Sequence, residues 1–369
     1  MKFTIQQAEL SKALQVVQNV VPGKTTMPVL TCILMEAEGE TLTLSATNLD
    51  ISVVTRVHGL KVAQAGKAAV PAAKLVSFVR SLAPGEVTMT EKGGKVQVAA
   101  GKASFSESSM NAEEFPALPA LASAKGLDVL SKDLVRMVKA TSYAVSRDET
   151  RPALMGILWE VKPTGLSMVA TDAHRLAKID AKLDWAVTDL RSLIADTQGL
   201  LQYARLAEDE DTTTVHLGQN QLSFVIGDTT LHTRILEGPF PDYTAVIPKG
   251  NDLQITIDRE AFMSAVRRVS ITADRITSQI RLGLESGRME LTATGTDGSR
   301  AEDELAVGYD GGAMEIGFNY GYLLDVLKNL GTDEVRMHCK DAQSAALLTP
   351  VDGEDDVLCL LMPLRLTSD

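Results

Sequence analysis

The sequence predicts an α+β protein made of three tandem copies of one domain, each with two helices packed on antiparallel strands. Three observations support this fold class. A set of short motifs recurs about every 123 residues, six segments show the apolar spacing of amphipathic helices, and the segments between them alternate with period two. A domain that carries helices on one face of an antiparallel sheet is an α+β domain.

The repeat is clearest in strands that contain an Ala-Thr doublet. The doublets begin at residues 46, 170 and 293, and an isoleucine stands thirteen residues before each of them, at Ile33, Ile157 and Ile280. Phe115-Pro116, Phe240-Pro241 and Met362-Pro363 follow near the end of each copy. One third of the 369 residues is 123, so the repeat accounts for the whole chain. We expect domains at residues 1–122, 123–250 and 251–369, with boundaries in Pro- and Gly-containing stretches.

Each copy is expected to contain two helices. Apolar residues at i, i+3, i+4 and i+7 recur in residues 8–18, 72–82, 131–141, 197–207, 259–269 and 320–330. Between these windows the pattern changes to alternation, as in Met289-Glu290-Leu291-Thr292-Ala293, with Gly, Asp and Asn at the turns.

The composition is that of a globular protein, with 45% apolar and 23% charged residues. The longest apolar runs are much shorter than the roughly 18 residues that a membrane-spanning helix needs, and the first residues do not form a signal-peptide core. We therefore expect a cytoplasmic protein. Cys32, Cys339 and Cys359 show neither disulfide nor zinc spacing, so we interpret them as core residues, and we expect no cofactor and no metal.

Positive charge is concentrated on the predicted helices. The six windows contain eleven basic and four acidic residues, a net charge of +7, although the whole chain has a net charge of -12. One interpretation is the ordinary preference of Lys and Arg for solvated helix faces. The other is that all six helices face one polyanion and read only its backbone charge. No aromatic residues alternate with these basic residues as a single-strand platform would require, which favours a duplex.

Motifs for catalysis are weak. Pro22-Gly23-Lys24-Thr25-Thr26 resembles the end of a phosphate-binding loop, but Gln18 occupies the place of its first glycine, so we interpret Gly23 as a helix C-cap. Asp172 and His174 are expected to lie on one side of a strand. The matching pairs in the other copies are taken as Asn48/Asp50 and Gly295/Asp297, which lack histidine. The other histidines show no metal-ligand spacing.

Several motifs together resemble a known family. The threefold repeat, a strand expected over residues 170–177 (Ala-Thr-Asp-Ala-His-Arg-Leu-Ala), the Phe240-Pro241-Asp242-Tyr243 segment and the closing residues 362–366 are similar to the bacterial sliding clamp family, the beta subunit of DNA polymerase III. The resemblance covers essentially the full length. It implies a homodimeric ring of six domains that encircles duplex DNA without sequence specificity. It also implies a non-catalytic processivity factor that tethers the polymerase III catalytic subunit, the clamp loader and repair proteins.

The resemblance and the charge pattern together give three sets of candidate site residues. The residues expected to face DNA are Lys12, Lys24, Lys74, Arg80, Lys132, Arg136, Lys139, Arg205, Arg267, Arg268 and Lys328. The expected dimer interface places Lys74, Lys95, Lys102 and Phe105 opposite Ile271, Glu302, Asp303 and Glu304. The expected partner-peptide pocket is made by Leu154, Thr171, His174, Arg175, Leu176, Pro241, Val246, Tyr322, Leu360, Met362, Pro363 and Arg365.

In the pocket, apolar side chains would bind hydrophobic anchors of a peptide, and Thr171, Arg175 and Arg365 would fix its polar groups. The alternative for each apolar member is ordinary domain core. The chain departs from the family at Ala173, where glycine is common. It also lacks aromatic side chains at residues 151–153 and ends in an acidic Thr367-Ser368-Asp369 tail.

Two other functions are kept open. One is an enzyme that uses Asp172 and His174 in a cleft between domains, and the other is a clamp-like scaffold that has lost its role on DNA.

Overall fold

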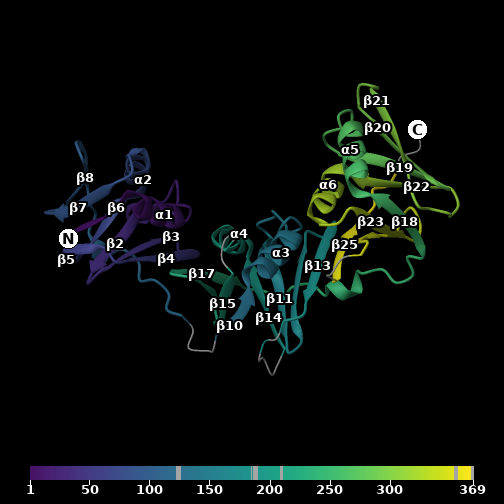
Figure 1. The fold of residues 1–369 in the computed structure, drawn as a ribbon. Coiled ribbons are helices and arrows are strands. Elements are labelled where there is room, and N and C mark those ends of the chain that lie inside the picture. Colours follow the sequence, from purple (N-terminus) through teal and green to yellow (C-terminus); the bar gives the residue numbers. More distant parts are fainter. Residues whose placement is uncertain (122–125, 184, 186–189, 208–210, 353–355, 367–369) are drawn as a thin grey trace. The chain divides into compact units, whose positions relative to one another are not determined.

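The computed structural model describes residues 1–121, 126–183, 185, 190–207, 211–352 and 356–366 (Figure 1). The predicted tail Thr367-Ser368-Asp369 lies outside these residues. The chain divides into two compact units, residues 1–135 with 198–235 and residues 136–197 with 236–369.

The first unit contains helices α1, α2 and most of α4. Their bounds are α1 Gln7–Gln18, α2 Ala72–Ser81 and α4 Thr197–Leu206. The strands before the second repeat are β1 Lys2–Gln6, β2 Cys32–Glu38, β3 Thr41–Thr47, β4 Ile51–His58, β5 Lys61–Gln64, β6 Gly66–Pro71, β7 Glu86–Lys92, β8 Lys95–Ala100 and β9 Ala103–Ser108. The strands from the second repeat are β10 Leu127–Leu130, β15 Thr212–Leu217, β16 Gln221–Ile226 and β17 Thr229–Leu236. Short 3-10 turns lie at η1 Pro28–Thr31 and η2 Ala112–Glu114.

Two antiparallel sheets organise this unit. One has the strand order β5-β1-β7-β8-β9. The other has the order β6-β2-β3-β4-β17-β16-β15-β10, so that β4 of the first repeat pairs with β17 of the second. We call the pairing of β4 with β17 the first junction. Ile51 lies opposite Thr233 there.

The second unit contains most of α3 Ser131–Ser142, together with α5 Arg259–Val269 and α6 Tyr320–Asn329. Its strands from the second repeat are β11 Gly156–Lys162, β12 Gly165–Thr171, β13 Arg175–Ala181 and β14 Arg191–Asp196. Those from the third repeat are β18 Leu253–Asp258, β19 Gln279–Glu285, β20 Arg288–Thr294, β21 Arg300–Ala306, β22 Met314–Asn319, β23 Glu334–Cys339, β24 Ala346–Pro350 and β25 Asp356–Leu361. Its 3-10 turns are η3 Pro152–Met155 and η4 Tyr243–Ala245.

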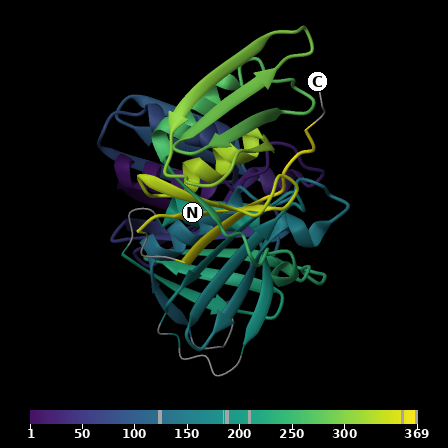
Figure 2. The same cartoon turned by 90° about the vertical axis from the view of Figure 1, so that its right-hand side faces the viewer.

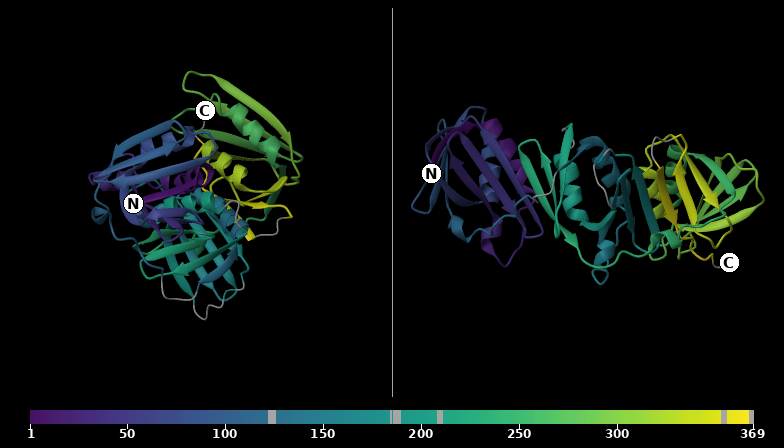
Figure 3. Two further views of the ribbon diagram at one scale, coloured as in Figure 1. Left: turned by 60° about the vertical axis from the view of Figure 1, so that its left-hand side comes forward. Right: turned by 90° about the horizontal axis from the view of Figure 1, so that it is seen from below.

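The sheets of the second unit follow the same plan. One has the order β14-β11-β12-β13-β25-β24-β23-β18, and the other β21-β20-β19-β22. Figure 3 shows the yellow strand β25 beside the teal strands of the second repeat. We call the pairing of β13 with β25 the second junction, in which Arg175 lies opposite Leu361.

The six predicted helices are confirmed to within one residue at each end. Each buries an apolar stripe; α1, for example, buries Leu10, Leu14 and Val17, and full burial of such a side chain stabilises the fold by roughly 1.5–3 kcal/mol. Helices α5 and α6 pack side by side and contact strands of both sheets of their unit, and Figure 2 shows α6 beneath the green strands. The side chain of Asn319 caps α6 by accepting hydrogen bonds from Gly321 N and Tyr322 N.

Two smaller expectations meet the structure differently. The interpretation of Gly23 as a helix cap is wrong, because α1 ends at Gln18 with Asn19 as its C-cap. The three cysteines are buried and free, as expected. Among the described residues, no helix is long and apolar enough to cross a membrane.

Candidate functional site

The predicted strand over residues 170–177 is a hairpin. Strand β12 ends at Thr171, β13 begins at Arg175, and a tight turn joins them. The Asp172 carboxylate accepts hydrogen bonds from His174 N (2.9 Å) and Arg175 N (3.0 Å), and Thr171 Oγ1 donates to Arg175 O (2.7 Å). Polar side chains that bond the backbone two or three residues ahead favour a turn over a continuous strand. The side chains of Thr171 and Asp172 therefore explain why the predicted single strand is two strands joined by a turn.

Arg175 stands at the centre of this site. Its Nε donates to Asp172 Oδ2 (3.0 Å), and its two terminal nitrogens donate to Asp325 Oδ2 (2.6 Å) and to Tyr143 O (2.5 Å). Its guanidinium carbon lies 4.4 Å from the ring centroid of Tyr322. Charge-assisted hydrogen bonds of this kind are the strong ones, so one side chain joins the turn, α6 and the end of α3.

An exposed apolar residue, Met362, lies next to this network. Met362 N donates to His174 O (2.9 Å), which places the residues after β25 against the turn. The rings of His174 and Tyr322 are stacked with centroids 6.5 Å apart. Met362 is 44% exposed and Val246 is 55% exposed, whereas Leu176 and Leu360 pair across the second junction inside a buried cluster. The predicted apolar residues thus divide into surface and core.

The other predicted pocket residues all lie in the same unit. Leu154 is buried in η3, and Pro241 and Val246 flank η4, whose Tyr243 packs into the same buried cluster. Pro363 and Arg365 follow Met362, and Arg365 O accepts a hydrogen bond from Gln279 Nε2 (3.2 Å).

Asp172 and His174 are not arranged as a catalytic pair. Both carboxylate oxygens of Asp172 bond backbone N–H groups or Arg175, and His174 contributes only its backbone N–H to that carboxylate. The third repeat has one more residue in this turn. Gly295 N bonds Ser299 O as Asp172 N bonds Arg175 O, so Gly295 matches Asp172 in the backbone, whereas Asp297 is the residue whose side chain accepts from Ser299 N as that of Asn48 accepts from Asp50 N.

Sequence analysis missed three members of the network. Asp172, Asp325 and Tyr143 were not in the predicted pocket, although Asp172 was considered for catalysis. A signal existed for Asp325, which is the sixth residue of α6, because the sixth residue of α4 is the neutral Gln202. The arginine and the carboxylate are both present at the second junction and both absent from the first, and this joint occurrence indicates an ion pair.

Burial also raises the pKa of two groups next to Arg175 and the second junction, the Tyr143 hydroxyl and the Cys359 thiol. Tyr143 Oη and Cys359 Sγ are 3.0 Å apart. Burial raises the pKa of the Tyr143 hydroxyl well above its ordinary value, and it raises the pKa of the Cys359 thiol to about 11. Both groups are protonated at neutral pH, so they add no charge to the network of Arg175, Asp172 and Asp325.

Most of the basic residues predicted to face DNA are exposed. Lys12, Arg80, Lys132, Lys139, Arg205, Arg267 and Lys328 are exposed on their helices, Arg136 is half-buried, and Lys24 is exposed in the segment after α1. Two others have acidic partners within the chain. Lys74 Nζ lies 2.8 Å from Glu107 Oε2, and the Arg268 guanidinium lies 2.6 Å from Asp303 Oδ2.

The residues predicted for a dimer interface lie on or near two edge strands. Lys102 lies in the turn before strand β9. Phe105 lies on β9, and its ring stacks on that of Phe78 with centroids 5.1 Å apart. Strand β21 carries Glu302, Asp303 and Glu304. Lys95 begins β8, and Ile271, which follows α5, is 83% exposed. In the described part of the chain, β9 pairs only with β8, and β21 pairs only with β20.

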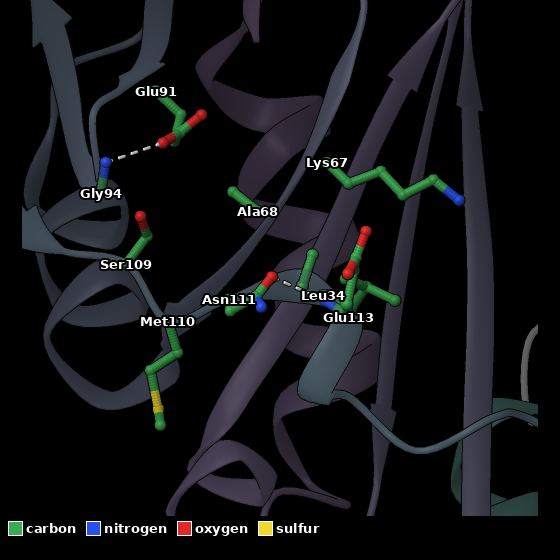
Figure 4. Close-up of a pocket in the computed structure, with 10 residues that line it drawn as sticks. Leu34, Lys67, Ala68, Glu91, Gly94, Ser109, Met110, Asn111 and Glu113 are labelled. Carbon is green, nitrogen blue, oxygen red and sulfur yellow. Dashed lines mark hydrogen bonds between the residues drawn. The ribbon is translucent and has the colours of Figure 1, made fainter.

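A cavity of about 670 Å³ opens beside the end of β9 (Figure 4). Three of its polar lining residues have partners within the chain. Glu91 accepts a hydrogen bond from Gly94 N (3.2 Å), Asn111 accepts one from Glu113 N (3.1 Å), and Lys67 forms an ion pair with Glu36 (2.8 Å). Such turn and surface contacts do not form a nucleophile with an adjacent base. Among the described residues, no group of three or more His, Cys, Asp or Glu could hold a metal ion.

Comparison with known proteins agrees with this architecture. Models of the N-terminal, central and C-terminal domains of the DNA polymerase III beta subunit match residues 1–119, 128–242 and 244–365. A beta sliding clamp from Pseudomonas putida is 36% identical over 99% of this chain and all of the relative.

Solved structures are similar over the same length. A sliding clamp from Pseudomonas aeruginosa bound to griselimycin has a TM-score of 0.95 at 35% identity, covering 99% of this chain and all of that one. A clamp from Bartonella birtlesii bound to griselimycin has a TM-score of 0.94 at 31% identity, with the same coverage. The predicted resemblance and the threefold fold are thereby confirmed, and the chain belongs to the DNA polymerase III beta subunit family, the beta sliding clamps.

Proposed function

We propose that two copies of this chain close head to tail into a ring, and the sheet topology carries this proposal. Each eight-stranded sheet takes four strands from one repeat and four from the next. The strands β22-β19-β20-β21 and β9-β8-β7-β1 are two remaining halves with the same design. Pairing β21 of one copy with β9 of another completes a third sheet and leaves neither of these two strands as an open edge.

The register of the first junction supplies a register for this third one. Ile51 lies opposite Thr233, the fifth residue of β17, and the fifth residue of β9 is Glu107. Ser299 takes the place of Ile51, because Gly295 N bonds Ser299 O as Asn48 N bonds Ile51 O. Ser299 of the second copy then lies opposite Glu107, and the acidic residues 302–304 come close to Lys102. Ile271 and Phe105 would supply apolar contact.

Light scattering on dilution from micromolar concentration tests ring closure. We expect a particle of about twice the 39.6 kDa chain mass. Lys102→Glu or Asp303→Lys alone should weaken the dimer, and the two together should recover part of the loss, because opposite charges are restored. A monomer at micromolar concentration, or a dimer indifferent to both reversals, would contradict this interface.

We also propose that duplex DNA passes through the ring, close to the basic helices. The charged residues of the six helices sum to +7 in a chain of net charge -12, which directs a polyanion to one surface. Contacts to phosphate alone are salt-sensitive and independent of sequence, so a threaded ring can slide. The test is retention on closed circular DNA loaded by a clamp loader. Linearisation should release the protein, and equal retention on both forms would refute threading.

The exposed surface at the second junction is proposed as the docking site for partner peptides. Met362 is exposed beside the turn that carries His174, whose ring stacks with Tyr322, and Val246 is a second exposed apolar residue of the same unit. Such side chains suit the hydrophobic anchors of a short peptide. The polymerase III catalytic subunit, the clamp loader and repair proteins would use it in turn. The chain would thus act in the cytoplasm as a non-catalytic processivity factor, with domains at residues 1–122, 123–250 and 251–369.

A further inference from the structure

Arg175 is surrounded by groups of its own chain. The residue is 8% exposed, and three of the five N–H donors that a guanidinium carries are directed at Asp172, Asp325 and Tyr143 O. The rings of Tyr322 and Tyr143 lie 4.4 and 5.6 Å from its guanidinium carbon. These contacts hold the positive charge inside the protein and do not present it to a ligand at the surface.

The groups that Arg175 joins are the parts of the proposed docking surface. Asp172 shapes the turn that carries His174, whose carbonyl accepts the Met362 N–H. Asp325 lies one turn along α6 from Tyr322, the ring that stacks with His174. The position of α6 relative to the turn therefore depends on the contact between Arg175 and Asp325.

The first junction shows that the turn itself does not need this arginine. Ile51 occupies the corresponding place, and the same turn forms there, with the Asn48 side chain accepting from Asp50 N (3.0 Å) and Ile51 N (2.7 Å). The sixth residue of α4 is Gln202, where α6 has Asp325, so the first junction lacks both the arginine and the carboxylate. The Arg175 side chain is only 10% exposed, and a buried charge that the turn does not require is costly to desolvate, which indicates a role beyond folding.

We propose that Arg175 is a positioning residue for the docking surface: through Asp325 it sets the distance between α6 and the turn, and it does not itself contact the docked peptide. The proposal rests on the proposed docking function of this surface. It differs from the role that the family resemblance implies, in which Arg175 would fix polar groups of the peptide.

A double-mutant cycle on the intact protein tests the proposal. Arg175→Gln, Asp325→Asn and the double variant would be titrated with a fluorescein-labelled short peptide that carries leucine and phenylalanine anchors. We expect each single variant to weaken binding about tenfold, and the double variant to be no weaker than the worse single one, because all three remove the same ion pair. Independent, additive losses, or no loss with Asp325→Asn, would overturn the proposal.

Two further measurements separate positioning from direct contact. The cycle would be repeated with the peptide as a C-terminal carboxylate and as an amide. A positioning residue weakens both by the same factor, whereas a direct contact to the carboxylate weakens the acid more. If Arg175→Gln fails to fold, Asp325→Asn still tests the proposal, because the Asp325 side chain is 47% exposed and its replacement should not disturb the core.

Hydrogen exchange gives a result that does not depend on any ligand. Asp325→Asn should speed exchange of the His174 and Arg175 amides and of α6 in the free protein, while Asp50→Asn, at the first junction, should leave them unchanged. Unaltered exchange would refute the positioning role. If the unaltered protein binds neither the peptide nor griselimycin, the docking function fails, and the exchange result still decides whether Arg175 holds α6 and the turn together.

Discussion

The two junctions of this chain share one backbone design and differ in their side chains. At both, a strand of one repeat pairs with the last strand of the next repeat. In that last strand, one residue lies opposite Ile51 or Arg175, and the backbone N–H of the residue after it donates a hydrogen bond to the turn. Arg234 N bonds Asp50 O (3.1 Å) at the first junction, and Met362 N bonds His174 O (2.9 Å) at the second. The shared backbone therefore explains the strand pairing at both junctions, and what distinguishes the junctions lies in their side chains.

The difference lies in the third residue of the adjoining helix. It is Tyr322 in α6 and Gly199 in α4. A Cβ on Gly199 would lie 1.9 Å from Thr233 Oγ1, so the first junction is closed by direct packing of α4 on β17. At the second, the ring of Tyr322 covers Arg175 and faces His174. A change from glycine to tyrosine thus separates a sealed junction from one with an aromatic surface.

Gly199→Ala should give the largest effect on stability. Alanine normally stabilises a helix interior relative to glycine by about 1 kcal/mol, but here the methyl group overlaps Thr233 and should destabilise the protein by about 2 kcal/mol. Denaturant unfolding measures the change. Gly321→Ala in α6 is the matched control, because the nearest atom to its Cβ is Asn319 Oδ1 at 3.1 Å, and it should cost much less. Equal losses in both variants would mean that the two junctions are packed alike.

Met362→Ala should affect binding and leave stability nearly unchanged. Its side chain is exposed, so we expect less than about 0.5 kcal/mol in the free energy of unfolding and about a tenfold loss of peptide affinity. Fluorescence anisotropy measures the affinity. Met27→Ala removes a similarly exposed methionine from the first repeat and should leave affinity unchanged. If the two variants bind alike, the surface at the second junction is not the docking site.

Acid should weaken the first junction before the second. His232 on β17 is buried beside Ser223 (2.8 Å), and burial, with a smaller effect of His216, lowers its pKa below 6.5. The folded state favours the neutral ring, so this contribution is present above pH 6.5 and is lost as pH falls through the lowered value. A single titrating group makes this a smaller effect than the substitutions above.

Hydrogen exchange of β4 and β17 between pH 7.5 and pH 5, corrected for intrinsic rates, measures that loss. His232→Gln should remove the pH dependence. Equal loss of protection in β13 and β25 would show that acid acts on the whole protein and not on the first junction.

Much of the fold could be predicted from the sequence because it repeats. Leu10, Leu134 and the other stripe residues mark helices by spacing alone, and the three Ala-Thr doublets mark the same strand three times. The site was harder to predict. Its apolar surface was expected from the family, but the partners of Arg175 come from Asp325 and Tyr143, 150 and 32 residues away. Periodicity reports which face of an element is buried, and it carries no information on contacts between distant elements.

The turns at the junctions provide the finest comparison. Leu49, Ala173 and Gly298 all have positive φ, of 80°, 79° and 81°. A residue with a Cβ is strained there by roughly 1–2 kcal/mol, so replacing it by glycine relieves the strain. Glycine also makes the unfolded chain more flexible, which cancels part of the stability gained. Leu49→Gly and Ala173→Gly should therefore each stabilise the protein by about 0.5 kcal/mol, and Gly298→Ala should destabilise it by about 1 kcal/mol.

Thermal unfolding of the three turn variants measures these effects, and peptide titration of Ala173→Gly adds a second readout at the same turn. If Ala173→Gly raises stability but weakens binding, the strained alanine contributes rigidity to the surface around His174. If affinity is unchanged, the hydrogen bonds made by the side chains of Thr171 and Asp172 suffice to hold the turn, as those of Thr47 and Asn48 do at the first junction.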